Sequence, residues 1–157
     1  MICQHPTLFA LCVGLLTSIG CGPSYEIADY EYDPQKSDLE NLLGEWVCVE
    51  ATKAGAPAPD LVGKAIEFQE EMVYMRAHPR DDGWIQTGYV LETENEPKRL
   101  VMNATPYGVG TPQLWIDLYR FEKGSLVLSR GEHQVTPLSF ESNADNGYSL
   151  LVYKRVK

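Results

Sequence analysis

The stretch that decides the fold is Ser37-Asp38-Leu39-Glu40-Asn41-Leu42-Leu43-Gly44-Glu45-Trp46-Val47-Cys48-Val49-Glu50-Ala51-Thr52. Its first half has helical features, because Ser37 and Glu40 have the spacing of a capping box and the leucines that follow fall on one face. Gly44 can end the helical turn in a left-handed conformation, and after it the pattern changes to the period of two that is typical of a strand. We therefore expect a helix of at most two turns, followed at once by the first strand of a sheet.

Segments with a period of two continue to the end of the chain, and turn residues interrupt them about every ten to fifteen positions. No stretch after Gly44 has a sustained helical apolar period. Eight strands are predicted, at residues 45–52, 64–69, 72–78, 84–91, 98–104, 114–121, 125–130 and 148–155. Pro and Gly lie in the connections between them. The sequence therefore predicts an all-β domain made largely of hairpins.

Eight antiparallel strands can close into an up-and-down barrel or pack as a sandwich, and composition alone does not choose between them. The short connections favour the barrel, since they join strands that are neighbours in the sequence. Closure also removes the unpaired edges that a row of Val, Ile and Tyr would otherwise expose. The interior of such a barrel is either filled by side chains or holds one small ligand.

The first twenty residues carry no Asp, Glu, Lys or Arg. Residues 8–16 form an apolar run that is too short to cross about 30 Å of hydrocarbon and has the length of a signal-peptide core. The segment Thr17-Ser18-Ile19-Gly20-Cys21 follows, and it resembles the lipobox of bacterial lipoproteins. The resemblance implies that residues 1–20 are removed, that Cys21 is acylated, and that the exported protein is anchored to a membrane of the cell envelope.

Two alternatives to the lipid anchor remain open at this point. An ordinary signal peptide could be cleaved near Gly20 or Gly22, which would give a secreted or periplasmic soluble protein. A buried amino-terminal helix is the other. In either lipid-anchored or soluble form, residues 21–36 are predicted to be an acidic tether and residues 37–157 the folded domain. Residues 22–36 hold four acids against one base and have no regular period, although their tyrosines could instead bind a partner.

The charge of the chain narrows the possible partners. Its 157 residues include 22 acidic and 13 basic ones, which gives a formal net charge of −9. A surface this negative repels phosphate backbones, so nucleic acid is not expected as a partner. Of the four cysteines, only Cys21 and Cys48 would remain after cleavage, so we expect no disulfide framework. Cys48 lies in the first predicted strand, where a thiol usually behaves as a small buried hydrophobe.

Motifs along the predicted strands resemble those of one protein family. Gly44-Glu45-Trp46 opens the first strand as the Gly-x-Trp of lipocalins does, and Tyr153-Lys154-Arg155 ends the last one. Between them stand, in order, Lys53-Ala54-Gly55-Ala56-Pro57, Gly88-Tyr89-Val90-Leu91, Pro97-Lys98-Arg99-Leu100, Leu118-Tyr119-Arg120-Phe121-Glu122 and Pro137-Leu138-Ser139-Phe140. Over about residues 38 to 156 the chain resembles the small lipocalin-like domains of unknown function that are abundant in exported proteins of planctomycete bacteria.

This resemblance implies a fold and export, and it implies no biochemical activity. The expected fold is a lipocalin-like antiparallel up-and-down β-barrel of about eight strands, preceded by the short helix. In such barrels an arginine at the position of Arg155 commonly stacks on the tryptophan at the position of Trp46, and closes one end of the barrel. A guanidinium over an indole face contributes about 1 to 2 kcal/mol when it is partly desolvated. Asp117 departs from the family, which usually has Gly there.

The residues that could line a ligand site are those that could face the interior of the barrel, namely Glu50, Tyr89, Trp115, Asp117 and Tyr119. Aromatic rings normally fill a core, whereas an inward carboxylate needs a partner or a cationic ligand. No nucleophile, metal-ligand or phosphate-loop motif is present, so we expect no catalytic residue, metal or cofactor. Three hypotheses follow. The first is a tethered barrel that binds a small apolar or amphipathic molecule, and the second is a filled barrel that is a structural or protein-interaction module of the envelope. The third is an enzyme with an active site that cannot be recognised from sequence motifs.

Overall fold

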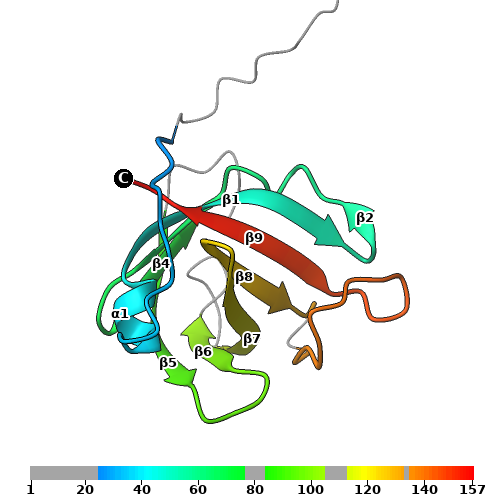
Figure 1. The fold of residues 1–157 in the computed structure, drawn as a ribbon. Helices are drawn as coiled ribbons and strands as arrows, with labels where there is room; N and C mark the ends of the chain where they lie inside the picture. The colour runs from blue at the N-terminus through cyan, green and yellow to red at the C-terminus, as the bar shows by residue number, and fades with distance from the viewer. Residues whose placement is uncertain (1–24, 77–83, 105–112, 133–134) are drawn as a thin grey trace, which may run out of the picture.

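The computed structural model describes residues 25–76, 84–104, 113–132 and 135–157, and every structural statement below concerns these residues. Within them the chain is nearly all β, with one short helix before the strands (Figure 1). The elements are α1 (Asp38–Leu42), β1 (Gly44–Lys53), β2 (Ala56–Pro57), β3 (Ala65–Phe68), β4 (Met72–Arg76), β5 (Trp84–Glu92), β6 (Arg99–Ala104), β7 (Gln113–Glu122), β8 (Ser125–Arg130) and β9 (Ser149–Arg155).

The strands form one closed antiparallel barrel. Their order is β2-β1-β3-β4-β5-β6-β7-β8-β9, and β1 pairs in addition with β9, from Trp46 opposite Arg155 to Lys53 opposite Ser149. Eight strands, β1 and β3 to β9, make up the barrel, while β2 folds back on the end of β1. This architecture is that of a lipocalin-like barrel, which confirms the predicted fold class and decides against a sandwich.

The local predictions agree with the observed elements. The Glu40 amide donates to the Ser37 hydroxyl at 3.2 Å, and the Ser37 amide donates to the Glu40 carboxylate at 2.8 Å, so the capping box that starts α1 is confirmed. Each of the eight predicted strands has an observed counterpart, although residues 77 and 78 of the third one lie outside the described residues. The two-residue β2 was not predicted, because residues 55–59 have the composition of a turn.

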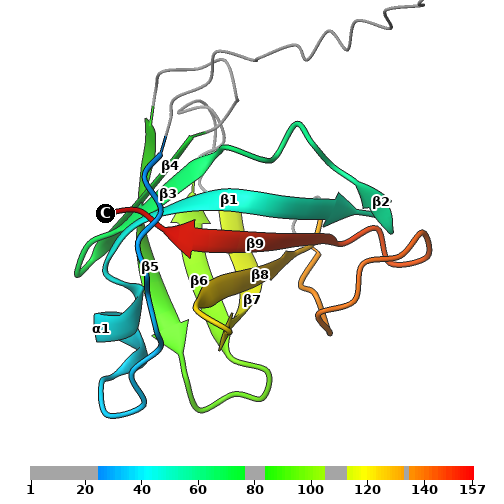
Figure 2. The ribbon, with the colours of Figure 1, turned by 45° about the horizontal axis from the view of Figure 1, so that its top comes forward.

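The two ends of the barrel differ (Figure 2). α1 covers one end, which we call the closed end, and large side chains fill the interior beneath it. Trp46, Phe68 and Tyr119 are each at most 1% exposed there. The other end, which we call the open end, is bordered by the loop between β2 and β3 and by the loop that connects β8 to β9. The space inside the barrel that the described residues leave unfilled therefore lies at the open end.

A β-bulge in β1 changes which side chains face the interior. Cys48 pairs with Tyr153, but Glu50 and not Val49 pairs with the next residue of β9, Val152. The extra residue shifts the alternation, so that Val49 and Glu50 are both exposed before Ala51 returns to the interior. Glu50, which the sequence left as a candidate for the interior, therefore lies on the outer surface.

Residues 25–36, which we call the strap, lie on the barrel and are not a solvated linker. The Ala28 amide donates to the Arg155 carbonyl at 2.8 Å, and the Lys157 amide donates to the Glu26 carbonyl at 3.0 Å. Further along, the Asp33 amide donates to the Asn41 side chain at 3.0 Å. Figures 1 and 2 show the strap passing the carboxyl end of β9 on its way to α1. The predicted flexible tether is thus wrong for its described part.

Among the described residues there is no helix of the length and apolar character that a membrane crossing requires.

Candidate functional site

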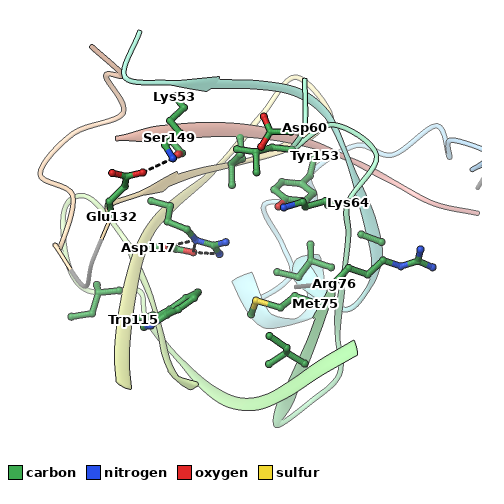
Figure 3. A pocket seen from close by; sticks show the side chains of 18 of the residues that line it. Lys53, Asp60, Lys64, Met75, Arg76, Trp115, Asp117, Glu132, Ser149 and Tyr153 are labelled. Carbon is green, nitrogen blue, oxygen red and sulfur yellow. Dashed lines mark hydrogen bonds and ion pairs between the residues drawn. The ribbon is translucent and has the colours of Figure 1, made fainter. Parts of the chain in front are cut away.

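A cavity of about 510 Å³ lies at the open end of the barrel (Figure 3). Part of its wall is apolar and comes from the inward-facing side chains of five strands, namely Ile66, Met75, Ile85, Trp115 and Leu151. Their positions follow from the strand period of two, because residues 66, 75 and 85 pair with one another across β3, β4 and β5. The cavity therefore has a continuous apolar side that is built from neighbouring strands.

An ion pair between β7 and β8 forms the polar side of the cavity. Arg130 donates from Nε to the two oxygens of Asp117 at 3.1 and 3.0 Å, and from Nη2 to Oδ2 at 2.6 Å. Asp117 is 1% exposed. Burial is the largest single influence and would lower the pKa of Arg130, but the charge and hydrogen bonds of Asp117, with smaller contributions from Tyr153 and Cys48, together outweigh burial and raise that pKa. The inward carboxylate of Asp117 thus has an intramolecular partner in Arg130, and the ion pair keeps the guanidinium in its charged form.

Two further buried groups lie near this ion pair. Burial raises the pKa of the Tyr153 hydroxyl, and the Arg130 charge opposes this shift only in part. Burial also raises the pKa of the Cys48 thiol, to about 11. Cys48 is therefore a protonated thiol at neutral pH, which does not fit a nucleophile. The Trp115 ring lies at the side of the pair, with the Arg130 guanidinium carbon 5.7 Å from its centroid.

Lys64 supplies a cation from the segment just before β3. It precedes Ile66 by two positions, so the strand period places it on the inner face, and its backbone carbonyl accepts a hydrogen bond from the Cys48 amide at 2.8 Å. Burial lowers the pKa of the Lys64 ammonium, Asp60 raises it again in part, and Arg130 lowers it further. Lys64 was not a candidate from the sequence, because nothing in residues 60–64 distinguishes an inward lysine from a solvated one.

The structure separates the five predicted lining residues. Trp115 and Asp117 line the cavity, whereas Glu50 lies on the outer surface. Tyr119 lies at the closed end, where its hydroxyl donates to Asp38 at 2.6 Å. Tyr89 packs edge-on against Phe68, and its hydroxyl donates to the Gln69 carbonyl at 2.7 Å. The two tyrosines stabilise the closed end and do not contribute to the cavity.

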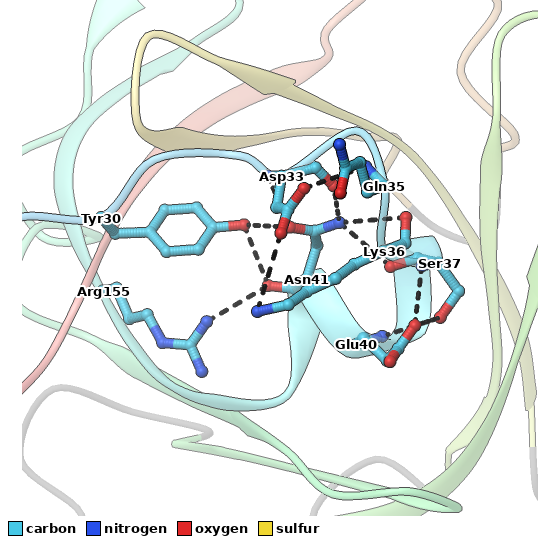
Figure 4. A network of polar contacts seen from close by, with 8 residues as sticks. All are labelled: Tyr30, Asp33, Gln35, Lys36, Ser37, Glu40, Asn41 and Arg155. Atoms are coloured by element: carbon cyan, nitrogen blue, oxygen red, sulfur yellow. Dashed lines mark hydrogen bonds and ion pairs between the residues drawn. The ribbon is translucent and has the colours of Figure 1, made fainter.

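Trp46 and Arg155 meet at the closed end, together with a residue of the strap. The Arg155 guanidinium carbon lies 5.6 Å from the centroid of a Trp46 ring and 5.1 Å from that of Tyr30. Arg155 also donates to the backbone carbonyl of Asn41 at 3.3 Å (Figure 4). A second donor nitrogen of Arg155 bonds the backbone carbonyl of Leu43. The cation therefore joins the last strand, the first strand, α1 and the strap, and Tyr30 was not predicted to take part.

Gly44 makes room for this arrangement. Its φ of +114° lies in the region that favours glycine, and a Cβ built there would be 2.8 Å from Nη2 of Arg155. The Trp46 indole donates to the Leu42 carbonyl at 2.8 Å from the same corner. The Gly-x-Trp pattern thus has a physical reason: the glycine admits the guanidinium and the tryptophan lies against it.

Fold and site together define a class: a lipocalin-like barrel that is filled at one end and hollow at the other. No family model, no curated protein and no solved structure matches the chain. Cys21, the predicted acylation site, lies outside the described residues. Within the residues that the structure does describe, no three His, Cys, Asp or Glu side chains are grouped so that they could hold a metal ion.

Proposed function

We propose that this protein is an envelope lipoprotein whose barrel binds one small apolar or amphipathic molecule at its open end. The observation that carries the proposal is the cavity of about 510 Å³, which lies within the usual range of about 300 to 1,000 Å³ for ligand pockets. Its apolar side would contact the hydrocarbon part of such a molecule. The ion pair of Asp117 and Arg130 supports the proposal as well, since an apolar ligand can cover it without leaving a single charge unpaired.

The proposal is tested by native mass spectrometry of the purified full-length protein, followed by a binding screen with lipophilic molecules. The matched variant is Met75→Trp, which fills part of the cavity. It should abolish binding, because Met75 faces inward and the larger side chain takes up the space of the ligand. Val90→Trp is the control, since Val90 is 63% exposed on the outer face of β5. A protein that is always ligand-free and binds nothing in the screen would exclude a carrier function.

We propose in addition that Cys21 carries the lipid that anchors the protein. Cys21 precedes Tyr25, the first described residue, by four positions, which a chain can span over at most about 14 Å. Because the strap is packed on the barrel, the domain would then lie directly beside the membrane surface. Cys21→Ala should release the protein from the membrane fraction, whereas full retention of this variant would contradict the anchor.

A second function is supported by a different observation. Leu114, Val135 and Leu138 are 55%, 54% and 78% exposed, and they lie on or near the loop that borders the open end. Exposed apolar side chains at one end of a domain can bind a protein partner. If this interaction module were the function, Leu138→Asp would abolish partner capture from an envelope extract, and Met75→Trp would leave capture unchanged.

A further inference from the structure

We propose that the ligand is an anionic amphiphile, whose small acidic head group is bound by Lys64, Tyr153 and Arg130 while its hydrocarbon part contacts the apolar side of the cavity. This inference rests on the proposed function and specifies the class of ligand. It depends on the charges in the cavity and on which of them already have partners.

The charges of the cavity lining are not fully paired. Its cations are Lys53, Lys64, Arg76 and Arg130, and its acids are Asp60, Asp117 and Glu132. Arg130 pairs with Asp117, and Lys53 pairs with Glu132 at the rim. Figure 3 shows the guanidinium of Arg76 pointing away from the cavity. Lys64 is therefore the inward-facing cation that neither ion pair uses.

The burial of Lys64 in the cavity is only partly compensated, through the charge of Asp60. Across the described ranges its ammonium makes no hydrogen bond or ion pair, and the nearby Asp60 is exposed to solvent. The lowered pKa of Lys64 has burial as its main cause, so the charged form is poorly solvated where it lies. A bound anion would offset this desolvation, whereas a cationic ligand would increase the unfavourable charge.

Two other donors face the same space. Arg130 uses Nε and Nη2 for Asp117, which leaves Nη1 outside the pair, and its side chain remains 25% exposed to the cavity. The Tyr153 hydroxyl lines the cavity too, and no hydrogen bond from it to another described residue is present. The carboxylates of Asp117 and Glu132 already accept from cations. An acidic head group would therefore meet donors from Lys64, Tyr153 and Arg130 without competition from these two carboxylates.

The apolar wall distinguishes an amphiphile from a free inorganic anion. Ile66, Met75 and Ile85 form a row across three strands beside the donors, and a small inorganic anion would leave this row uncovered. Covering this row removes apolar surface from water, which favours binding of a hydrocarbon chain. The cavity therefore favours a molecule that combines one negative charge with a hydrocarbon chain.

Isothermal titration calorimetry of the full-length protein tests the inference with three probes of equal chain length: decanoate, decanol and decyltrimethylammonium. We expect decanoate to bind about tenfold to a hundredfold more tightly than decanol, and the ammonium probe to bind most weakly. Lys64→Met should remove most of the preference for decanoate and leave the affinity for decanol unchanged. Lys36→Met is the control for net charge, because Lys36 is an exposed residue of the strap.

The outcomes separate this inference from the proposed function. Equal binding of decanol and decanoate, with no effect of Lys64→Met, would overturn the anionic head group and leave an apolar carrier. Equal weakening of both probes by Lys64→Met would also overturn it, since the lysine would then shape the cavity in general. Inorganic phosphate that binds as tightly as decanoate would overturn the amphiphile. Failure of all three probes, together with a ligand-free native mass spectrum, would overturn the proposed function itself.

Discussion

Asp117 and Arg130 stand opposite each other on β7 and β8 and form a two-pronged ion pair inside the barrel, with a shortest contact of 2.6 Å. Two buried charges that neutralise each other contribute little net stability compared with apolar residues, but removal of one leaves the other uncompensated. The pair therefore makes the fold sensitive to single substitutions on either strand.

We predict that Asp117→Asn lowers the free energy of unfolding by about 3 to 5 kcal/mol, since Arg130 would remain buried without its counter-ion. Urea denaturation measures the loss. The double variant Asp117→Leu with Arg130→Met should be more stable than Asp117→Asn alone. If the loss of unfolding free energy in the double variant equals the sum of the losses in Asp117→Leu and Arg130→Met alone, the two charges are not coupled.

Tyr119 and Asp38 hold α1 on the closed end. The Tyr119 hydroxyl donates to Asp38, which also accepts from Lys98 at 2.9 Å. Burial is the main cause that raises the pKa of Tyr119, and the hydrogen bond to Asp38 is the second. Tyr119→Phe should lower the unfolding free energy by about 1 to 3 kcal/mol, because a buried carboxylate loses a donor. Tyr74→Phe, on the outer face of β4, is the control and should change stability little. Similar losses for both variants would argue against a stabilising role of the hydrogen bond between Tyr119 and Asp38.

Cys48 makes the fold sensitive to alkaline pH. Its pKa is raised to about 11 in the folded state, whereas a thiol in the unfolded chain titrates near 8.5. The folded state therefore holds its proton more tightly, so the stabilisation is complete below about pH 8.5 and is lost as the pH rises towards about 11. We expect the free energy of unfolding to fall by about 3 kcal/mol over this window. Urea denaturation at a series of pH values measures this fall.

Cys48→Ala is the variant that isolates this effect. It should reduce the stability at neutral pH, because a buried side chain becomes smaller, and it should flatten the pH dependence between about 8.5 and 11 relative to the parent protein. Tyr89, whose pKa burial raises to about 12, contributes a further loss only above about pH 10, where a tyrosine of the unfolded chain begins to ionise, so the range between about pH 8.5 and 10 reports on Cys48. An unchanged slope in Cys48→Ala would assign the alkaline loss to the tyrosines.

The strap contributes to stability through Tyr30. Its ring lies edge-on to Trp46 at 5.0 Å between centroids, and its hydroxyl donates to Asn41 Oδ1 at 3.0 Å. Tyr30→Ala should lower the unfolding free energy by about 2 to 4 kcal/mol, and Tyr30→Phe, which keeps the ring, by about 1 kcal/mol. Thermal unfolding of both variants checks the order. A strap that does not stabilise the domain would give no loss in either.

Local patterns account for most of what could be predicted from the sequence. The capping box of Ser37 and Glu40 and the turn glycines act over a few residues, so the helix and strands could be placed without knowledge of their neighbours. The bulge that turns Glu50 outward could not, because it depends on how β1 pairs with β9. The strap was mistaken for a linker for a similar reason: its polar composition is that of a loop, and its order comes from distant contacts.

The candidate site was only half visible in the sequence. Trp115 and Asp117 were candidates because an aromatic ring and a carboxylate in a predicted strand could each face the interior of the barrel. Their partners Lys64, Arg130 and Tyr153 come from three other parts of the chain, and alternation places each inward only after the strand boundaries and pairing are known. An inward arginine opposite Asp117 could have been sought once an antiparallel pairing of residues 114–121 with 125–130 was assumed.

The closure of β1 on β9 also has a consequence for the order in which the protein folds. Asn41 and Arg155, which meet at the closed end, are 114 positions apart. A chain that leaves a ribosome or crosses a membrane with its amino terminus first has Trp46 and the free edge of β1 exposed until the last strand arrives. Long-range closure of this kind is slow, because the intervening chain must be ordered before the final contacts form. The barrel can therefore close only after nearly the whole domain is present, and β1 is the strand that waits longest for its last partner.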